Sequence, residues 1–157
     1  MTIQSKTLEL LTSSHPDIQF VPGASYHWSP ANKIVYYTEN DESVEGVWAL
    51  LHETSHGLLG HAKYRSDFEL LLLEVAAWEH AKLLATNLSV DTGNAYNEHM
   101  EDCLDSYRNW LHKRSLCPDC SLSSVQIDAS TYSCIFCHKR WKVTAERFCR
   151  PYRKTLA

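Results

Sequence analysis

The sequence is poor in the residues that mark linkers, fibrous repeats and membrane spans. Glycine and proline number only five each among 157 residues, too few for low-complexity linkers or a collagen-like repeat. The leucine run Leu70–Leu73 ends at Glu74, and no run approaches the roughly 18 apolar residues that a membrane helix needs. The first residues lack the sustained apolar core of a secretory signal. We therefore expect a cytoplasmic globular protein.

Charge is divided unevenly along the chain. Residues 1–111 hold six Lys and Arg against sixteen Asp and Glu, whereas residues 112–157 hold nine Lys and Arg against three Asp and Glu. An acidic body with a basic tail indicates two modules with different partners, or a tail that packs on its own body. We expect a main domain over residues 1–114 and a small second domain over residues 115–157.

The cysteines gather in the second half of the chain. Four of the six form two Cys-x-x-Cys pairs separated by thirteen residues, a pattern typical of a structural zinc site with four thiolates. A disulfide framework is the alternative, but no secretion signal places the chain in an oxidising compartment. Cys103 is expected to be a core thiol, and Cys149 is left over. The predicted zinc ligands are Cys117, Cys120, Cys134 and Cys137.

A second metal motif, H-E-x-x-H, begins at His52. His52 and His56 are four residues apart, so a helix places both on one face, where they can hold one Zn²⁺. Glu53 lies beside them, suitably placed to take a proton from a zinc-bound water. Apolar residues precede and follow the motif, which indicates a buried helix capped by Ser43 or Asp41. The alternative is a helix that carries two core histidines.

A catalytic zinc needs a third protein ligand, and Glu74 is the predicted one. All its neighbours three and four residues away are apolar, so its carboxylate needs a cation to meet it. Glu69 and Glu79 each have a basic residue one turn away and are expected to be exposed. His61 follows the motif at the wrong spacing for a third histidine ligand, and we expect it at the surface or beside a ligand. His80 is the candidate for a third histidine ligand farther downstream, but its spacing from the motif makes that role doubtful.

The segments HETSHGLLGH and ELLLLEVAAWEHAKLLA together resemble the ImmA/IrrE-type metallopeptidases, minigluzincin-like members of the gluzincin zincins. The resemblance implies a zincin-like fold, peptide-bond hydrolysis, zinc ligation by His52, His56 and Glu74, and Glu53 as the catalytic acid and base. Trp78 departs from the pattern, because some gluzincins place there a carboxylate that orients a ligand histidine. The C-terminal zinc ribbon is instead similar to that of the SprT/Spartan-type metallopeptidases.

The predicted fold class is α+β, with a small antiparallel or mixed sheet packed on the active-site helix and on further helices. The best strand is Lys33–Thr38, bounded by turn residues. In zincins the analogous sheet edge lines the cleft, so a peptide substrate could add there as an extra strand. Helices are expected over 1–14, from 44 through the motif, over 66–84 and over 97–114; strands over 17–21, 25–28, 124–128 and 131–133.

Two residues near the start of the last helix, Tyr96 and His99, are candidates for stabilising the oxyanion of a tetrahedral intermediate.

The tail mixes basic residues with aromatic ones, a pattern that can grip nucleic acid. The sequence thus favours a selective metallopeptidase with one catalytic and one structural zinc. The alternatives are a degenerate zincin that binds nucleic acid or protein through its ribbon, or a protease that its ribbon recruits to DNA. The tail residues concerned are Arg140, Trp141, Lys142, Arg147, Phe148, Arg150, Tyr152, Arg153 and Lys154.

Overall fold

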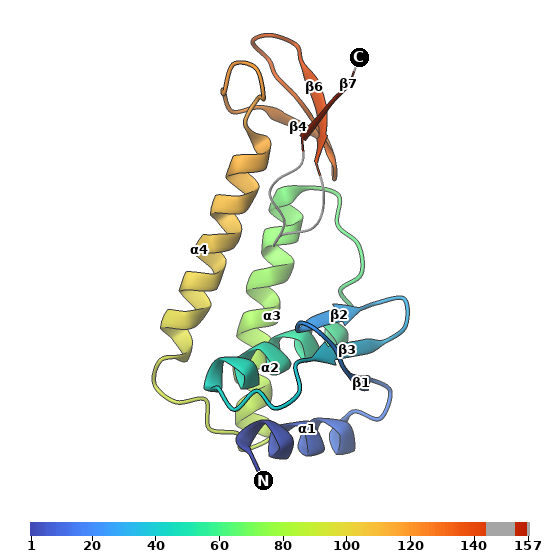
Figure 1. Cartoon of the computed structure of the whole chain (residues 1–157), viewed down its shortest axis with the longest axis vertical. Coiled ribbons are helices and arrows are strands. Elements are labelled where there is room, and N and C mark those ends of the chain that lie inside the picture. The colour runs from blue at the N-terminus through green and yellow to red at the C-terminus, as the bar shows by residue number, and fades with distance from the viewer. Residues whose placement is uncertain (144–152, 157) are drawn as a thin grey trace. The chain divides into compact units, whose positions relative to one another are not determined.

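The computed structural model describes residues 1–143 and 153–156 and forms two compact units (Figure 1). The first unit comprises residues 1–63 and 73–100, and the second comprises residues 64–72 and the described residues after 100. Four helices and two small sheets make up the described chain, which confirms the predicted α+β class. None of the described helices combines the length and the apolar character that a membrane crossing demands.

The first unit contains a helix, a small sheet and then the helix that carries the H-E-x-x-H motif. Figure 1 shows these elements in blue to teal, with α1 and α2 next to the strands. The last two helices contribute the part of α3 from Leu73 onward and the first residues of α4. The bounds are α1 Ile3–Ser14, β1 Gln19–Pro22, β2 His27–Ser29, β3 Ile34–Tyr37, α2 Val44–Leu58, α3 Asp67–Asn87 and α4 Tyr96–Ser115.

The sheet of the first unit is mixed, with the strand order β1-β3-β2. β1 runs parallel to β3, whereas β2 runs antiparallel to it. The strand predicted over Lys33–Thr38 is therefore present as β3, but it is the central strand. The expectation that a peptide could add to it is wrong, because β1 and β2 already take the hydrogen-bonding groups on both of its sides. β2 is the edge strand that lies next to α2.

Sequence signals at both ends explain the bounds of α2. Ser43 is the N-cap, and its hydroxyl accepts a hydrogen bond from the amide of Gly46 at 3.0 Å. At the other end Gly60 has φ +70°, a conformation that glycine adopts without strain. The amide of Gly60 donates to the carbonyl of Gly57, and the amide of His61 donates to the carbonyl of His56. These two bonds form a Schellman motif, which turns the chain back so that His61 lies beside His56.

Apolar side chains fix which face of α2 is buried. Val47, Leu50 and Leu51 are fully buried, as is Val35 on β3. The hydroxyls of Thr54 and Ser55, the two residues before the second motif histidine, donate to carbonyls one turn earlier in the helix, so these buried polar groups are satisfied. The motif therefore lies within a well-packed helix, as predicted.

The second unit contains the start of α3, most of α4 and a four-stranded antiparallel sheet of order β4-β5-β6-β7. Its core includes two aromatic rings from facing strand positions, Tyr132 and Trp141, which stack with centroids 5.8 Å apart. Trp141 is fully buried, so the expectation that it could grip nucleic acid is wrong. The strands are β4 Val125–Asp128, β5 Thr131–Ser133, β6 Arg140–Val143 and β7 Arg153–Leu156. The tail residues Arg147, Phe148, Arg150 and Tyr152 lie outside the described residues.

A buried polar network ties the ribbon to the first turn of α3. The Asp67 carboxylate accepts hydrogen bonds from the Arg114 guanidinium, the Tyr132 hydroxyl and the Gln126 amide. The Gln126 side-chain oxygen in turn accepts from the backbone amide of Asp67 at 2.8 Å. Arg114 is only 1% exposed, so its buried positive charge is stabilised by the Asp67 carboxylate rather than by water. The ribbon is thus anchored by side chains that lie far apart in the sequence.

Candidate metal centres

Side chains from α2 and α3 bring the predicted histidine and glutamate ligands together. His52 Nε2 and His56 Nε2 lie 3.1 Å apart. The carboxylate of Glu74 reaches both, with its oxygens 3.2 Å from His52 Nε2 and 3.3 Å from His56 Nε2. All three residues are buried to 9% exposure or less. We call these three residues the histidine group.

The donor set of the histidine group suits a zinc ion. Zinc binds imidazole nitrogen and carboxylate oxygen at about 2.0–2.2 Å, so neighbouring donors of a tetrahedral ion lie roughly 3.3 Å apart. The three donor atoms of the histidine group have spacings of that size. A tetrahedral ion held by these three described donors would have a fourth position for a small molecule, whereas a structural zinc site has four protein ligands.

The charges of the histidine group are strongly coupled even without an ion. Burial alone would raise the pKa of Glu74, but hydrogen bonds and charges from His52 and His56 outweigh it and hold that pKa well below its usual range. Burial would lower the pKa of His56, and the contact with Glu74 reverses this and raises it. The buried carboxylate is therefore ionised and attracts positive charge, whether that charge is a proton or a metal.

Glu53 lies at the margin of the histidine group. One oxygen, Oε2, accepts a hydrogen bond from the backbone amide of Trp28 on β2 at 2.8 Å. The other, Oε1, lies 3.9 Å from His52 Nε2. Burial raises the pKa of Glu53, and the neighbouring histidines oppose that rise. The edge strand thus fixes one carboxylate oxygen and leaves the other facing the ligands.

His61 lies beside the ligand candidate His56, which is one of the two positions that the sequence left open for it. The Nδ1 atoms of the two rings lie 2.8 Å apart. If His56 uses Nε2 as a ligand, its Nδ1 carries the proton and donates to His61. The carbonyl of His61 accepts from the indole nitrogen of Trp28 at 3.0 Å, so the same strand residue contacts both Glu53 and His61. The signal in the sequence is Gly60, because a Schellman turn brings the residue after it back to His56.

His52 has a different neighbour, the indole of Trp78. The two rings stack with centroids 4.1 Å apart and planes inclined by 22°. The rings of Tyr96 and His99 contact Trp78, and the ring of Trp48 contacts both of them. We call these three residues, together with Trp78, the aromatic cluster. The Tyr96 hydroxyl donates to the carbonyl of Trp78 at 2.6 Å. Tyr96 and His99 thus lie in this cluster, and their predicted role in stabilising an oxyanion stays a prediction.

The other candidate ligands on α3 lie outside the histidine group. Glu69 pairs with Arg65 and accepts a hydrogen bond from its backbone amide at 2.7 Å, as the sequence indicated. Glu79 is exposed. His80 Nδ1 lies 3.0 Å from the hydroxyl of Ser55 and contacts the motif helix there. Glu74 is accordingly the residue of α3 that shares a group with His52 and His56.

A pocket of about 430 Å³ lies at the C-terminal end of α2. Trp28 and His61, which contact Glu53 and His56, form part of its wall. Ile18 and Leu58 add apolar surface, and Lys33 adds a charge. The pocket has the size and the apolar lining of a site that takes a side chain or a small molecule.

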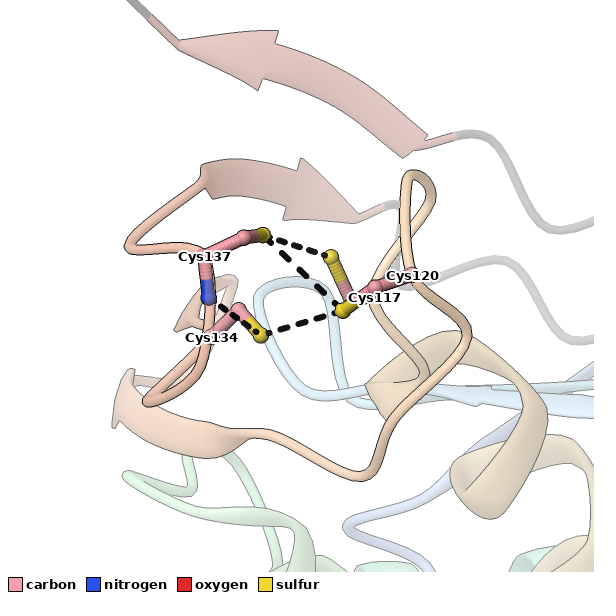
Figure 2. A group of neighbouring side chains, drawn as sticks. All are labelled: Cys117, Cys120, Cys134 and Cys137. Carbon is pink, nitrogen blue, oxygen red and sulfur yellow. Dashed lines mark hydrogen bonds between the residues drawn. The ribbon is translucent and has the colours of Figure 1, made fainter.

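The four predicted cysteines form the second candidate metal centre, which we call the cysteine group (Figure 2). Figure 2 shows the four sulfurs converging from two knuckles. Sulfur–sulfur distances are 3.5 Å for Cys117 to Cys137, 3.4 Å for Cys120 to Cys134 and 3.9 Å for Cys120 to Cys137. A tetrahedral zinc with bonds of about 2.3 Å separates its sulfurs by roughly 3.8 Å, so the donors fit that ion. Cys103 lies outside the group, and Cys149 lies outside the described residues.

Two groups of side chains can therefore hold a metal ion, and both were identified from spacing and burial in the sequence. The contacts of Glu53 with Trp28, of His56 with His61 and of His52 with Trp78 were not identified in that way, because they depend on how the elements pack. Function must be inferred from these residues and their geometry. No family model matches the chain, and no curated protein or solved structure matches it either.

Proposed function

We propose that the chain is a zinc-dependent metallopeptidase with a zincin-like active site and a C-terminal zinc ribbon, similar to the ImmA/IrrE type. The observation that carries the proposal is the convergence of His52, His56 and Glu74 beside Glu53. A zinc ion in the histidine group would polarise the scissile carbonyl and make water more acidic. The cysteine group takes the structural zinc.

In this proposal Glu53 is the general base. The amide of Trp28 holds Oε2, so Oε1 is the oxygen that accepts the proton of the attacking water. Glu53 then delivers that proton to the leaving amine. Because the hydrogen bond from the strand restricts the carboxylate, little freedom is lost when substrate binds. The edge strand β2 lies beside this site and offers a place for the backbone of an extended peptide.

The test compares the full-length, zinc-loaded protein with Glu53→Gln on unfolded proteins and peptide mixtures. General-base catalysis contributes roughly 10²–10⁴-fold, so we expect cleavage to fall by that factor in the variant. Metal content should stay unchanged at two zinc ions per chain, because Glu53 is no ligand. Glu79→Gln is the matched control, since Glu79 is exposed and outside the group. Equal cleavage by wild type and Glu53→Gln would reject the proposal.

A second candidate function is binding of nucleic acid through the ribbon, and exposed residues favour it. Arg140 and Lys142 on β6 are exposed, and Phe136 in the second knuckle is 71% exposed. Exposed cations and an exposed aromatic ring suit contacts with phosphates and bases. Binding to single-stranded DNA that weakens steeply with salt, and that Phe136→Ala reduces, would support this function. Binding that does not depend on salt would argue against it.

A further inference from the structure

The two histidines of the histidine group have different support, although they lie one turn apart on α2. His56 has a ring partner at its second nitrogen, His61. The second nitrogen of His52, Nδ1, is buried and lacks a hydrogen-bond partner among the residues that the structure describes. A histidine that binds metal through Nε2 normally donates a hydrogen bond from Nδ1, and that bond fixes the ring. The ring of His52 must be held in another way.

We propose that Trp78 is a positioning residue for His52: its stacked indole, in place of a hydrogen-bond acceptor, holds the imidazole in the orientation that binds metal. The inference rests on the proposed metal site and adds a residue to it. The rings lie 4.1 Å apart at 22°, which is an offset stack.

Stacking restrains the one torsion that matters. With its Cβ fixed by the helix, the imidazole of His52 can still turn about the Cβ–Cγ bond, and this torsion has a broad preference. Such a turn would push the edge of the ring into the indole of Trp78. The stack therefore keeps the plane of the imidazole, and with it the direction of Nε2 toward Glu74, where the two atoms lie 3.2 Å apart.

The stack also favours the metal-bound form of His52. Binding of a cation at Nε2 draws electrons from the imidazole and makes the ring more positive. The face of an indole carries negative charge and attracts such a ring. Trp78 thus stabilises the loaded site more than the empty one, which a purely apolar side chain of equal size would not do.

Trp78 is itself held firmly enough to serve as a support. It is 6% exposed, and its carbonyl accepts a hydrogen bond from the Tyr96 hydroxyl. It follows Glu74 by four residues on α3, so both side chains lie on one face of that helix. A single helix therefore supplies the third donor and the support for the first.

The experiment measures zinc affinity of the full chain by competition with a chromophoric chelator, while thiol reactivity follows the cysteine group separately. Trp78→Leu should weaken zinc binding at the histidine group about tenfold, within the range for residues that support a ligand. Trp78→Phe keeps a ring face and should stay within about threefold of wild type. Trp48→Leu is the matched control: Trp48 belongs to the same aromatic cluster but contacts Tyr96 edge-on and His99 at a tilt, so its loss should leave the affinity unchanged.

A second measurement does not depend on the folding of any variant. In the NMR spectrum of the wild-type protein, the ring current of the indole should shift the imidazole protons of His52 upfield. Ring protons at their ordinary positions would overturn the inference. Wild-type affinity in Trp78→Leu would also overturn it and leave the proposed function standing. A wild-type protein that binds no zinc at the histidine group would instead overturn the proposed function itself.

Discussion

The histidine group and the cysteine group differ in how their donors come together. The four sulfurs come from two short knuckles within residues 117–137, and each knuckle fixes its own pair through local turns. The histidine group combines two rings from α2 with a carboxylate from α3. Its geometry therefore depends on the packing of one helix against another. The comparison shows that local turns can build a closed site, whereas an open site is built on rigid elements that meet.

The two groups also differ in how much of their surroundings is exposed to solvent. Cys137 is exposed, and the side chains at the tip of its knuckle face solvent. The residues of the histidine group are buried, and each of its rings has a second ring against it. Four donors complete the coordination of a structural ion, while three leave room for chemistry. Under the proposed function, the rings that support the histidine group are therefore part of the active site.

Removal of a cysteine donor should have the largest effect and should be confined to one group. In Cys134→Ala the ribbon loses a zinc ligand, and binding of structural zinc supplies roughly 10–16 kcal/mol of folding free energy in small zinc domains. We expect zinc content to fall from two ions to one and the near-ultraviolet dichroism of the Tyr132–Trp141 stack to disappear. Cys103→Ala is the control, because Cys103 lies outside the group. Retention of both ions in Cys134→Ala would contradict the assignment.

The ribbon should also lose stability when Asp67, which pairs with the buried Arg114, is replaced. Asp67→Asn removes the charge that faces Arg114, and breaking a buried ion pair costs about 3–5 kcal/mol. Denaturant unfolding, followed by tryptophan fluorescence, measures the loss in unfolding free energy. Asp105→Asn breaks an exposed pair with Arg108 and should cost less than about 1 kcal/mol. If the two variants lost equal stability, the buried pair of Asp67 with Arg114 would contribute no more to folding than an exposed ion pair.

At the histidine group, Glu74→Gln should remove one ion and leave the fold largely intact. An amide keeps the size of the side chain but lacks the charge that attracts the metal. We expect zinc affinity to fall more than about 100-fold, beyond the range for residues that merely support a ligand. Glu79→Gln serves as the control on the same helix. Elemental analysis that finds two ions in Glu74→Gln would show that another residue is the third ligand.

Sequence reasoning located donors better than it located their neighbours. The spacing of the cysteines and of His52 and His56 reflects local geometry, so these donors could be predicted from the sequence alone. Glu74 was found because a carboxylate among apolar residues needs a cation. The contact of Glu53 with Trp28 could not be found, because a backbone amide leaves no mark in the sequence.

Strand order shows a similar limit. The β-branched and aromatic residues of β3 predicted a strand correctly, yet they could not tell an edge from a centre. Which strands flank β3 is decided by loops whose sequence carries little of that information. Trp141 was misjudged for the same reason, since an alternating basic and aromatic pattern hides which face of β6 is buried. The residues of α2 were predicted well because its cap, its periodicity and its closing glycine agree with one another.

Loss of His61 should produce a smaller effect than loss of a donor. His61→Ala removes the partner of His56 Nδ1, and such partners contribute about tenfold to metal affinity. Zinc competition measures the change. His80→Ala is the matched control, because His80 contacts Ser55 rather than a ligand. An unchanged affinity in His61→Ala would mean that His56, like His52, keeps its orientation without a hydrogen bond to its second ring nitrogen.

The smallest expected effect concerns acid stability at the start of α2. Hydrogen bonds from Ser43 hold the pKa of Asp41 below its ordinary value, so folding favours the ionised form. Its contribution is therefore present above about pH 4 and is lost as pH falls through the lowered pKa. Because Asp41 is partly exposed, we expect only about 0.3 kcal/mol. Between pH 5 and pH 2.5, the free energy of urea unfolding should fall less in Asp41→Asn than in wild type. The other carboxyl groups titrate in both proteins, so the difference between the two declines reports on Asp41. Equal declines would mean that the cap of α2 depends on the Ser43 hydroxyl alone, and that the helix of the histidine group begins without help from charge.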